Sequence, residues 1–475
     1  MEFSATVSEP VSYLAYPFSL PSIATAVFSC FLCFFYLYFF GRGLSTNATW
    51  YALTEDALSN HSKAREQWMT DAQELLYGGL KKIKGAIIVT SPIGPTIFLP
   101  NSFAGEIRNM KELSFSRSIV KNALAREPGL NPILAIDYHG VMQEVARLDL
   151  TRSLDISDWK TVDLKPLIHR LVARISSRVF LGPELSNNEE WLNIALSYVT
   201  QASMVTRKLR GLHPLLRPLA RWWFPELGVC REQVDKARKI ITPLVQDRLQ
   251  RKANGQITEK TADMLSWLDD KAKAKGVKID FAEFQLLLVV AAVHTTTETI
   301  AMFMADLIEN KEAISQLRKE IISTFSTSGW KKTSLASMTL LDSAMKESQR
   351  LNPITDRYRL AVEHRLRDPT LWSDVNKFQP DRFLKLRDTD RSKWNFVTGS
   401  PEHLGFGYGK QSCPGRFFAS NEIKVIVIHM LLKYDWEFTD QGRLPNGLSG
   451  TDRYMDPRQK VMLKSRKEEI NLGLP

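Results

Sequence analysis

The sequence is poor in cysteine and lacks the composition of a modular or fibrous protein. Its 475 residues include 4 cysteines, at positions 30, 33, 230 and 413, too few for a disulfide framework, so a reducing compartment fits. No internal repeat, low-complexity tract or long Pro/Gly/Ser linker divides the chain. We therefore expect one large domain, and the 44% of hydrophobic residues is enough to form its core.

Charge is absent from one long stretch near the N-terminus. No charged residue occurs between Glu9 and Arg42, and the mostly apolar segment Leu20–Phe40 would span about 31 Å as a helix, enough to cross a bilayer. The segment has no basic region before it and no small-x-small cleavage site after it, which favours a retained anchor over a signal peptide. Because the basic flank follows the segment, we expect residues 1–19 in the lumen and the rest in the cytosol.

The net charge of +11 excludes few partners by itself, because basic residues are dispersed and accompany no nucleic-acid-binding motif. We expect a membrane surface and an acidic redox protein as partners, and no nucleic acid.

Hydrophobic periodicity predicts a mainly helical chain. Residues 41–84 are expected to form a linker and the first helices, and Gly85–Leu99 two short strands around two prolines. Helical patterns dominate from residue 101 to 250. Further helices are expected from Asp280 to about Asn310 and over Leu340–Leu351.

The most informative stretch surrounds Cys413. Gly405, Gly407 and Gly409 permit close backbone approach and positive φ, and an apolar helix is predicted after Arg416. A thiol just before a helix N-terminus is favoured as the thiolate, which binds soft metals. Haem iron held by a cysteine thiolate favours cleavage of the O–O bond. The alternative is a buried structural cysteine in a glycine turn.

The predicted central helix carries polar residues in an otherwise apolar run. Residues 286–293 are all apolar and must be buried, yet residues 294–297 are His-Thr-Thr-Thr. The hydroxyl of Thr295 can bond to the carbonyl of Ala291, which would open or bend the helix and leave a notch lined by a hydroxyl. The alternative is a satisfied polar patch in the core.

Another predicted helix places Glu347 and Arg350 three residues apart on one face, close enough to pair. This spacing alone indicates no more than a surface ion pair, and Glu144 and Arg147 share it.

Several of these segments together resemble the cytochrome P450 family of haem-thiolate monooxygenases. The signature around the cysteine consists of Phe406, Gly409, Cys413 and Gly415, with Pro414, Arg416 and Ala419. Residues 291–296 resemble the family's oxygen-activating segment, Glu347 and Arg350 its ExxR helix, and Arg382 in residues 378–383 the arginine that completes a Glu-Arg-Arg cluster. The resemblance covers roughly residues 85 to 465 and is to fungal members of secondary metabolism.

The resemblance implies a fold and a set of roles. It implies a mainly α-helical haem-thiolate domain with a small β-sheet region over residues 85–475, containing haem b. Cys413 would be the axial iron ligand, with Phe406, Gly409 and Gly415 also at the haem. Thr295 and His294 would deliver protons to bound dioxygen. A buried cluster of Glu347, Arg350 and Arg382 would fix the cysteine loop.

The sequence departs from the family pattern at three places. His294 replaces the usual acidic residue, although imidazole can also relay protons. Gln411 stands where a basic residue usually reaches a haem propionate, so that contact is lost or passes to Lys410. Beyond Thr355 the chain passes almost at once to the segment before residue 378, without a substrate-facing loop and several strands that the family carries there.

We therefore expect a single-pass enzyme of the endoplasmic reticulum membrane that oxidises a lipophilic secondary metabolite, a terpenoid or meroterpenoid. Its electrons would come from NADPH through an NADPH-cytochrome reductase, with cytochrome b5 as a second donor. Two alternatives stay open. The shortened chain could be a catalytically impaired haem protein or a truncated product, or the protein could be a haem-thiolate isomerase or dehydratase that needs no reductase.

Overall fold

The computed structural model describes residues 47–470 except 84, 108–109, 111–112, 114, 125, 128, 131, 133–157, 213, 223, 255–263, 330, 355–364, 391, 450–451 and 468. Its contacts divide the chain into Met1–Ala48 and a compact unit, Thr49–Pro475. The predicted anchor Leu20–Phe40 lies outside the described residues. The described helices and strands all lie in Thr49–Pro475.

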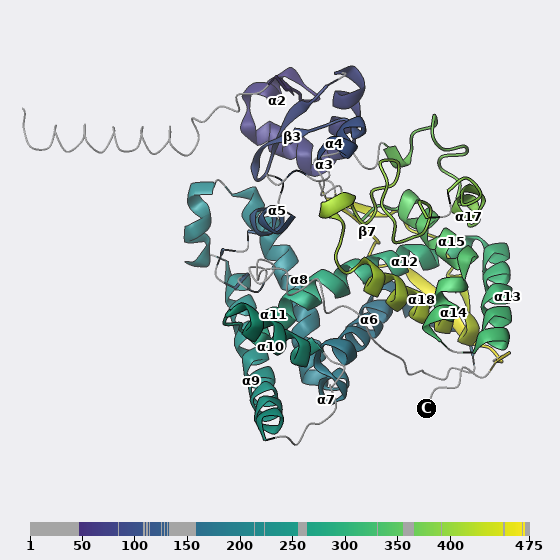
Figure 1. The fold of residues 1–475 in the computed structure, drawn as a ribbon. Coiled ribbons are helices and arrows are strands. Elements are labelled where there is room, and N and C mark those ends of the chain that lie inside the picture. The colour runs from purple at the N-terminus through teal and green to yellow at the C-terminus, as the bar shows by residue number, and fades with distance from the viewer. Residues whose placement is uncertain are drawn as a thin grey trace, which may run out of the picture. The chain divides into compact units, whose positions relative to one another are not determined.

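Helices dominate this unit, as predicted (Figure 1). Its longer helices are α3 (His61–Lys82), α5 (Phe115–Asn122), α6 (Leu164–Leu181), α8 (Glu189–Gly211), α9 (Pro225–Ala253), α10 (Met264–Lys275), α11 (Phe281–Leu288), α12 (His294–Glu309), α13 (Lys311–Ser328), α15 (Thr339–Leu351) and α18 (Arg416–Lys433). Shorter helical segments are α2 (Glu55–Ser59), η1 (Asn101–Phe103), α4 (Ala104–Ile107), α7 (Pro183–Ser186), η4 (Pro214–Trp222), α14 (Lys332–Ser337), α17 (Arg382–Leu386) and η6 (Gly409–Gln411).

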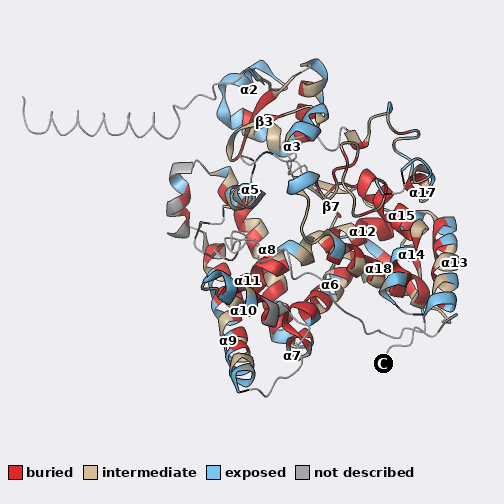
Figure 2. Ribbon diagram, in the orientation of Figure 1, coloured by how far each residue is buried: buried red, intermediate tan, exposed pale blue. Residues whose placement is uncertain are grey.

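The central helix is built as the sequence predicted. Asp280 caps it, since its side chain accepts hydrogen bonds from the backbone N–H groups of Ala282 and Glu283 at 2.9 and 3.0 Å. Helix α11 then continues through a π-helical turn, η5 (Val289–Val293), into α12, which ends before Asn310. Helices α6, α13, α15 and α18 all contact α12, and Figure 2 shows α12 mainly in the colour of buried residues. The main core is therefore organised around this helix.

The strands form small sheets. Strands β2 (Ile87–Ser91) and β3 (Gly94–Phe98) are the antiparallel pair expected within residues 85–99, and β1 (Thr49–Trp50) pairs in parallel with β2. A second sheet has the order β4 (Lys160–Asp163), β8 (Lys460–Ser465) and β5 (Tyr434–Phe438). Strands β6 (Gly447–Ser449) and β7 (Asp452–Tyr454) form a hairpin. A mainly α fold with a small β region is confirmed.

Within the described part of the chain, one helical stretch is long and apolar enough to cross a membrane. This stretch, Phe281–Glu309, is the central helix, and most of it is buried inside the protein. Its apolar character is therefore explained by packing in the core.

Candidate active site

The loop that carries Cys413, residues 405–413 and called the cysteine loop below, requires its own glycines and the glycine at position 399. Gly407 and Gly409 have φ of 77° and 64°, in the left-handed region that disfavours other residues. A Cβ on Gly405 would lie 2.1 Å from Oε1 of Gln349, and a Cβ on Gly399 would lie 1.8 Å from the carbonyl oxygen of Gly407. Close backbone approach and positive φ, both predicted from the sequence, fix the course of this loop.

Cys413 lies half-buried three residues before α18. Its backbone N–H donates to the carbonyl of Phe406 at 2.7 Å, and Nη1 of Arg416 donates to the carbonyl of Cys413 at 2.9 Å. Of the described cysteines, neither Cys230 nor Cys413 is in a disulfide. Because α18 begins at Arg416, the positive end of its dipole favours an anion near the sulfur. This is the placement that thiolate ligation needs.

The residues around Cys413 leave room on one side. A Cβ added to Gly415 would meet no atom within 4 Å, although Gly415 is two residues from the cysteine. The ring of Phe406 packs edge-on against Phe396 with ring centroids 5.0 Å apart. A flat group could therefore approach the loop beside Gly415. The contact with Phe396 fixes the ring of Phe406.

Gln411, the departure from the family signature, has a definite place in the structure. Its side-chain amide donates to the backbone carbonyl of Leu113, which ties the loop to the segment before α5. The neighbouring Lys410 is exposed. Lys410 is thus the better candidate for a contact with an anionic group.

The central helix contains the predicted notch. Oγ1 of Thr295 donates to the carbonyl of Ala291 at 2.7 Å, the bond expected from the sequence, and the π-helical turn lies directly before α12. Ala291 is exposed in the middle of this otherwise buried helix. An apolar residue exposed at such a place indicates open space against the helix, and His294 and Thr295 are only half-buried beside it.

The two halves of the candidate site lie on elements that contact each other, because α12 packs against α18. The hydroxyl of Thr295 is directed to its own helix, where it donates to the carbonyl of Ala291. Open space beside Gly415 and beside Ala291 fits a flat, largely apolar group such as haem.

Glu347, Arg350 and Arg382 form the predicted buried cluster. Nε and Nη2 of Arg350 donate to the two carboxylate oxygens of Glu347 at 2.8 and 2.9 Å, and Nε of Arg382 donates to Oε1 at 3.0 Å. The side chains of Glu347 and Arg350 are fully buried and that of Arg382 is 6% exposed. Burial of three charges is tolerated because each is paired and hydrogen-bonded.

This cluster also holds backbone groups of the segment that follows α15. Nη1 of Arg350 donates to the carbonyls of Leu366 and Val375, each at 2.8 Å, and Nη1 of Arg382 donates to the carbonyl of Ser373 at 2.7 Å. The cluster therefore fixes the segment that leads to the cysteine loop.

Several buried polar residues near these elements were not predicted from the sequence. Lys346 of α15 is buried, as is His403, which precedes the cysteine loop, and Glu422 of α18 accepts a hydrogen bond from Ser176 of α6 at 2.7 Å. Burial raises the pKa of Glu422 to about 8, although the hydroxyls of Ser176 and Thr296 oppose the shift. Polar residues within helical patterns give no sign of burial when every face of the helix is covered.

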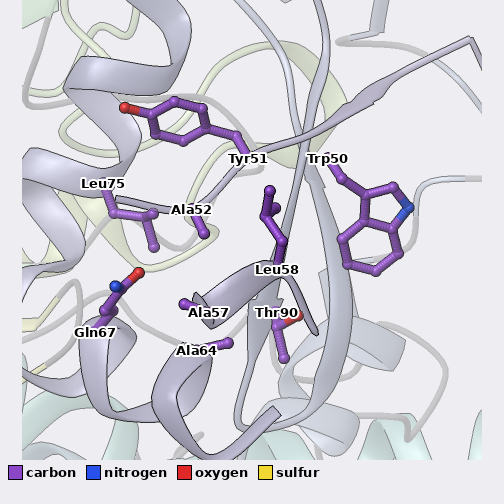
Figure 3. Close-up of a pocket in the computed structure, with 9 residues that line it drawn as sticks. All are labelled: Trp50, Tyr51, Ala52, Ala57, Leu58, Ala64, Gln67, Leu75 and Thr90. Atoms are coloured by element: carbon purple, nitrogen blue, oxygen red, sulfur yellow. The ribbon is translucent and has the colours of Figure 1, made fainter. Parts of the chain in front are cut away.

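A shallow hollow elsewhere in the unit has no part in this site. It encloses about 240 Å³, including open solvent, and its nine lining residues come from the N-terminal sheet and helices (Figure 3). Trp50, Tyr51, Leu58 and Leu75 are its largest apolar side chains. None of its lining residues belongs to the cysteine loop, the central helix or the Glu-Arg-Arg cluster.

Comparison with known proteins gives consistent matches along the chain. The cytochrome P450 family profile matches residues 117–365 and 360–464. Cytochrome P450 monooxygenase hepE of Aspergillus oryzae is 34% identical, covering 87% of this chain and 84% of that protein. Cytochrome P450 monooxygenase adrA of Penicillium rubens is 33% identical, covering 86% and 90%. Cyanobacterial CYP120A1, solved with retinoic acid bound, has a TM-score of 0.60 and 16% identity, covering 85% of this chain and 96% of that one.

In these alignments, some positions of the relatives have no corresponding residue in this chain. The alignment with hepE extends over 466 positions but covers 87% of the 475 residues, so about 50 positions have no counterpart here. The alignment with adrA, over 462 positions and 86% of the chain, gives about the same number. The two family matches meet at residues 360–365. This supports the shortening that the sequence indicated after Thr355.

Proposed function

Because the chain belongs to the cytochrome P450 family, we propose that it is a membrane-anchored haem-thiolate monooxygenase whose substrate is a lipophilic secondary metabolite. The family match covers most of the chain, and the relatives named above are P450 monooxygenases. The observation that carries the proposal for this chain is the placement of Cys413 before α18, in a glycine-rich loop whose preceding segment is held by the buried Glu-Arg-Arg cluster.

Haem b is the cofactor that the family implies, and it supplies the chemistry that activates dioxygen. In this proposal Cys413 holds the haem iron, while Phe406, Gly409 and Gly415 flank the haem. The open space beside Gly415 supports this assignment. Lys410 takes the place of the basic residue that Gln411 replaces, since it is exposed while the Gln411 amide is bonded to Leu113.

Thr295 and His294 are proposed to hold and move protons at the notch of the central helix. The hydroxyl of Thr295 donates to Ala291, which leaves its oxygen lone pairs able to accept a further hydrogen bond. His294 is next to it and half-buried, and an imidazole titrates near neutral pH. Val289 and Val293, both buried, make the helix apolar beside the notch.

The finer parts of the proposal concern substrate and location. A terpenoid or meroterpenoid suits the apolar central helix and a chain tethered to a membrane, from which lipophilic compounds can partition. The uncharged segment Leu20–Phe40 would place the protein in the endoplasmic reticulum membrane with its catalytic part cytosolic. NADPH-derived electrons would arrive from a membrane reductase, with cytochrome b5 as a second donor.

One experiment tests the haem site directly. The carbon monoxide difference spectrum of the reduced, detergent-solubilised protein should show a thiolate-type Soret band that Cys413→Ala abolishes. Cys230→Ala is the matched control, because Cys230 is fully buried and burial raises the pKa of its thiol to about 11, so it is inert. A thiolate-type band that persists in Cys413→Ala would refute the assignment.

A second candidate function is haem binding without turnover, and the shortened connection favours it. Both functions predict the thiolate-type band. They differ when reductase and NADPH are added, because a competent enzyme oxidises NADPH faster in the presence of a substrate and releases an oxygenated product. Intact haem with no product from any lipophilic substrate would favour the second function.

A further inference from the structure

His403 is a buried histidine between the ExxR helix α15 and the cysteine loop. His403 is 1% exposed, and its Nε2 lies 3.2 Å from the backbone carbonyl oxygen of Lys346 in α15. On the other side of the ring, the backbone N–H of Gly405 donates to Nδ1 at 3.4 Å. One imidazole therefore bridges the helix and the first glycine of the loop.

These two partners determine the tautomer of His403. A backbone N–H can only donate, so Nδ1 must accept and carries no proton. A carbonyl can only accept, so Nε2 must carry the proton that it donates to Lys346. Both bonds are satisfied at once by a single neutral form of the ring. Burial and the nearby Lys346 and Arg350 hold the pKa of His403 well below its usual value, which keeps the ring in that form.

The side chain of Lys346 binds the segment that precedes His403. It is fully buried, and Nζ donates to the carbonyls of Asn395 and Thr398 at 3.0 and 2.7 Å. These two carbonyls belong to the segment that leads to the cysteine loop. The centroid of the Phe383 ring lies 5.5 Å from Nζ of Lys346, and the same ring packs edge-on against His403. The lysine and the histidine therefore contact the same aromatic side chain.

We propose that His403, together with Lys346, is a positioning residue that fixes the cysteine loop relative to α15, independently of the Glu-Arg-Arg cluster. A continuous series of bonds supports this role. It runs from the Lys346 carbonyl to His403, from His403 to the N–H of Gly405, and from the carbonyl of Phe406 to the N–H of Cys413. The Glu-Arg-Arg cluster instead holds the earlier segment, at Leu366, Ser373 and Val375.

The inference rests on the proposed haem-thiolate function for its consequence, since a displaced loop would weaken thiolate ligation. His403→Phe keeps a ring of similar size but removes both hydrogen bonds. His403→Asn keeps an acceptor near the position of Nδ1 and should restore part of the bond to Gly405. His429→Phe is the matched control, because His429 of α18 is also buried and its Nδ1 pairs with Val425 of its own helix.

The first readout is the rate at which the thiolate-type band of the reduced, carbon monoxide-bound protein converts to the inactive-form band on warming. Loss of one or two hydrogen bonds should accelerate conversion in His403→Phe by about threefold to tenfold. We expect a smaller increase in His403→Asn and the wild-type rate in His429→Phe. Equal acceleration in His403→Phe and His429→Phe would overturn the proposal.

The second readout does not depend on haem and separates the inference from the proposed function. Hydrogen–deuterium exchange of the peptide that covers Gly405–Cys413 should be faster in His403→Phe than in wild type, and unchanged in His429→Phe. Lys346→Met should give the same change in the peptide that covers Asn395–Gly399. Unchanged exchange in both peptides would refute the inference, whereas absence of any thiolate-type band in wild type would refute the proposed function alone.

Discussion

At the scale of single residues, the bond from Thr295 to Ala291 gives a sharp test of proton delivery. Thr295→Val keeps the shape of the side chain but removes the hydroxyl from the notch. If the hydroxyl guides protons, NADPH should still be oxidised while product per NADPH falls by about tenfold or more, and Thr295→Ser should recover most of it. The ratio of product formed to NADPH consumed measures this effect.

The same helix offers the control. Oγ1 of Thr299 donates to the carbonyl of Thr295 at 2.9 Å, the same bond one turn further on. Thr299→Val therefore removes an equivalent hydroxyl but keeps the Thr295 hydroxyl and its bond to Ala291, and its product ratio should equal that of wild type. A loss of coupling in Thr299→Val as large as in Thr295→Val would show that bending of the helix, and not the hydroxyl at the notch, is responsible.

The raised pKa of Glu422 predicts that the free energy of unfolding depends on pH. Its pKa is about 8 in the folded protein because of burial, above the usual 4.5. Below about pH 4.5 both states carry the proton. Between about pH 4.5 and 8 only the folded state keeps it, so the free energy of unfolding falls as the pH rises, and above about pH 8 this effect is complete. Glu422→Gln, which is neutral at every pH, should lack this loss.

The measurement is the denaturant unfolding of both proteins at about pH 6 and about pH 8.5. Wild type should lose about 2–3 kcal/mol more than Glu422→Gln between these pH values, since each pKa unit corresponds to about 1.4 kcal/mol. Other groups that titrate in this range are present in both proteins and cancel in the comparison. Equal losses in the two proteins would mean that Glu422 is already ionised in the folded state at pH 6.

At the scale of elements, the buried charges of α15 hold the segment that leads to the cysteine loop. Glu347→Gln would leave Arg350 and Arg382 without their shared carboxylate, and breaking a buried pair in this way costs about 3–5 kcal/mol. We expect loss of bound haem and a lower melting temperature. Asp235→Asn breaks a pair with the same i,i+3 spacing to Arg238, but Asp235 is 67% exposed, so haem content should be unchanged.

The elements also show which parts of the structure a sequence can predict. The notch was predictable because Thr295 and Ala291 are four residues apart. The conformation of the cysteine loop was predictable because glycines in the sequence indicate positive φ and close backbone approach. The sheet β4-β8-β5 was not predicted, since β4 and β8 are about 300 residues apart and neither has a strong pattern. His403 was missed for the same reason, because its partner Lys346 lies 57 residues away.

At the scale of the whole molecule, the shortened connection is compatible with an intact cluster. Residues 355–364 lie outside the described residues, but both flanks are attached to α15 or its C-terminal end. Nη2 of Arg367 donates to the carbonyl of Leu351 and Nη1 of Arg350 to that of Leu366, each at 2.8 Å. Before the gap, the carbonyl of Ile354 accepts from the N–H of Arg453 in β7 at 3.0 Å. A short connection can therefore join two flanks that are each held in place, one by β7 and the other by α15.

The predicted membrane anchor can be tested in the whole chain. If Leu20–Phe40 is the anchor, then Leu32→Arg with Phe35→Arg should release the protein from alkaline-washed membranes, because each arginine in the middle of an apolar span costs about 2.5–3.5 kcal/mol. Since Thr49–Pro475 forms a compact unit by itself, the released protein should keep its thiolate-type band. Arginines at Ser45 and Thr46, beyond the apolar segment, serve as the control and should leave the protein in the membrane pellet. Retention of the Leu32→Arg, Phe35→Arg protein in that pellet would place membrane attachment in another part of the chain.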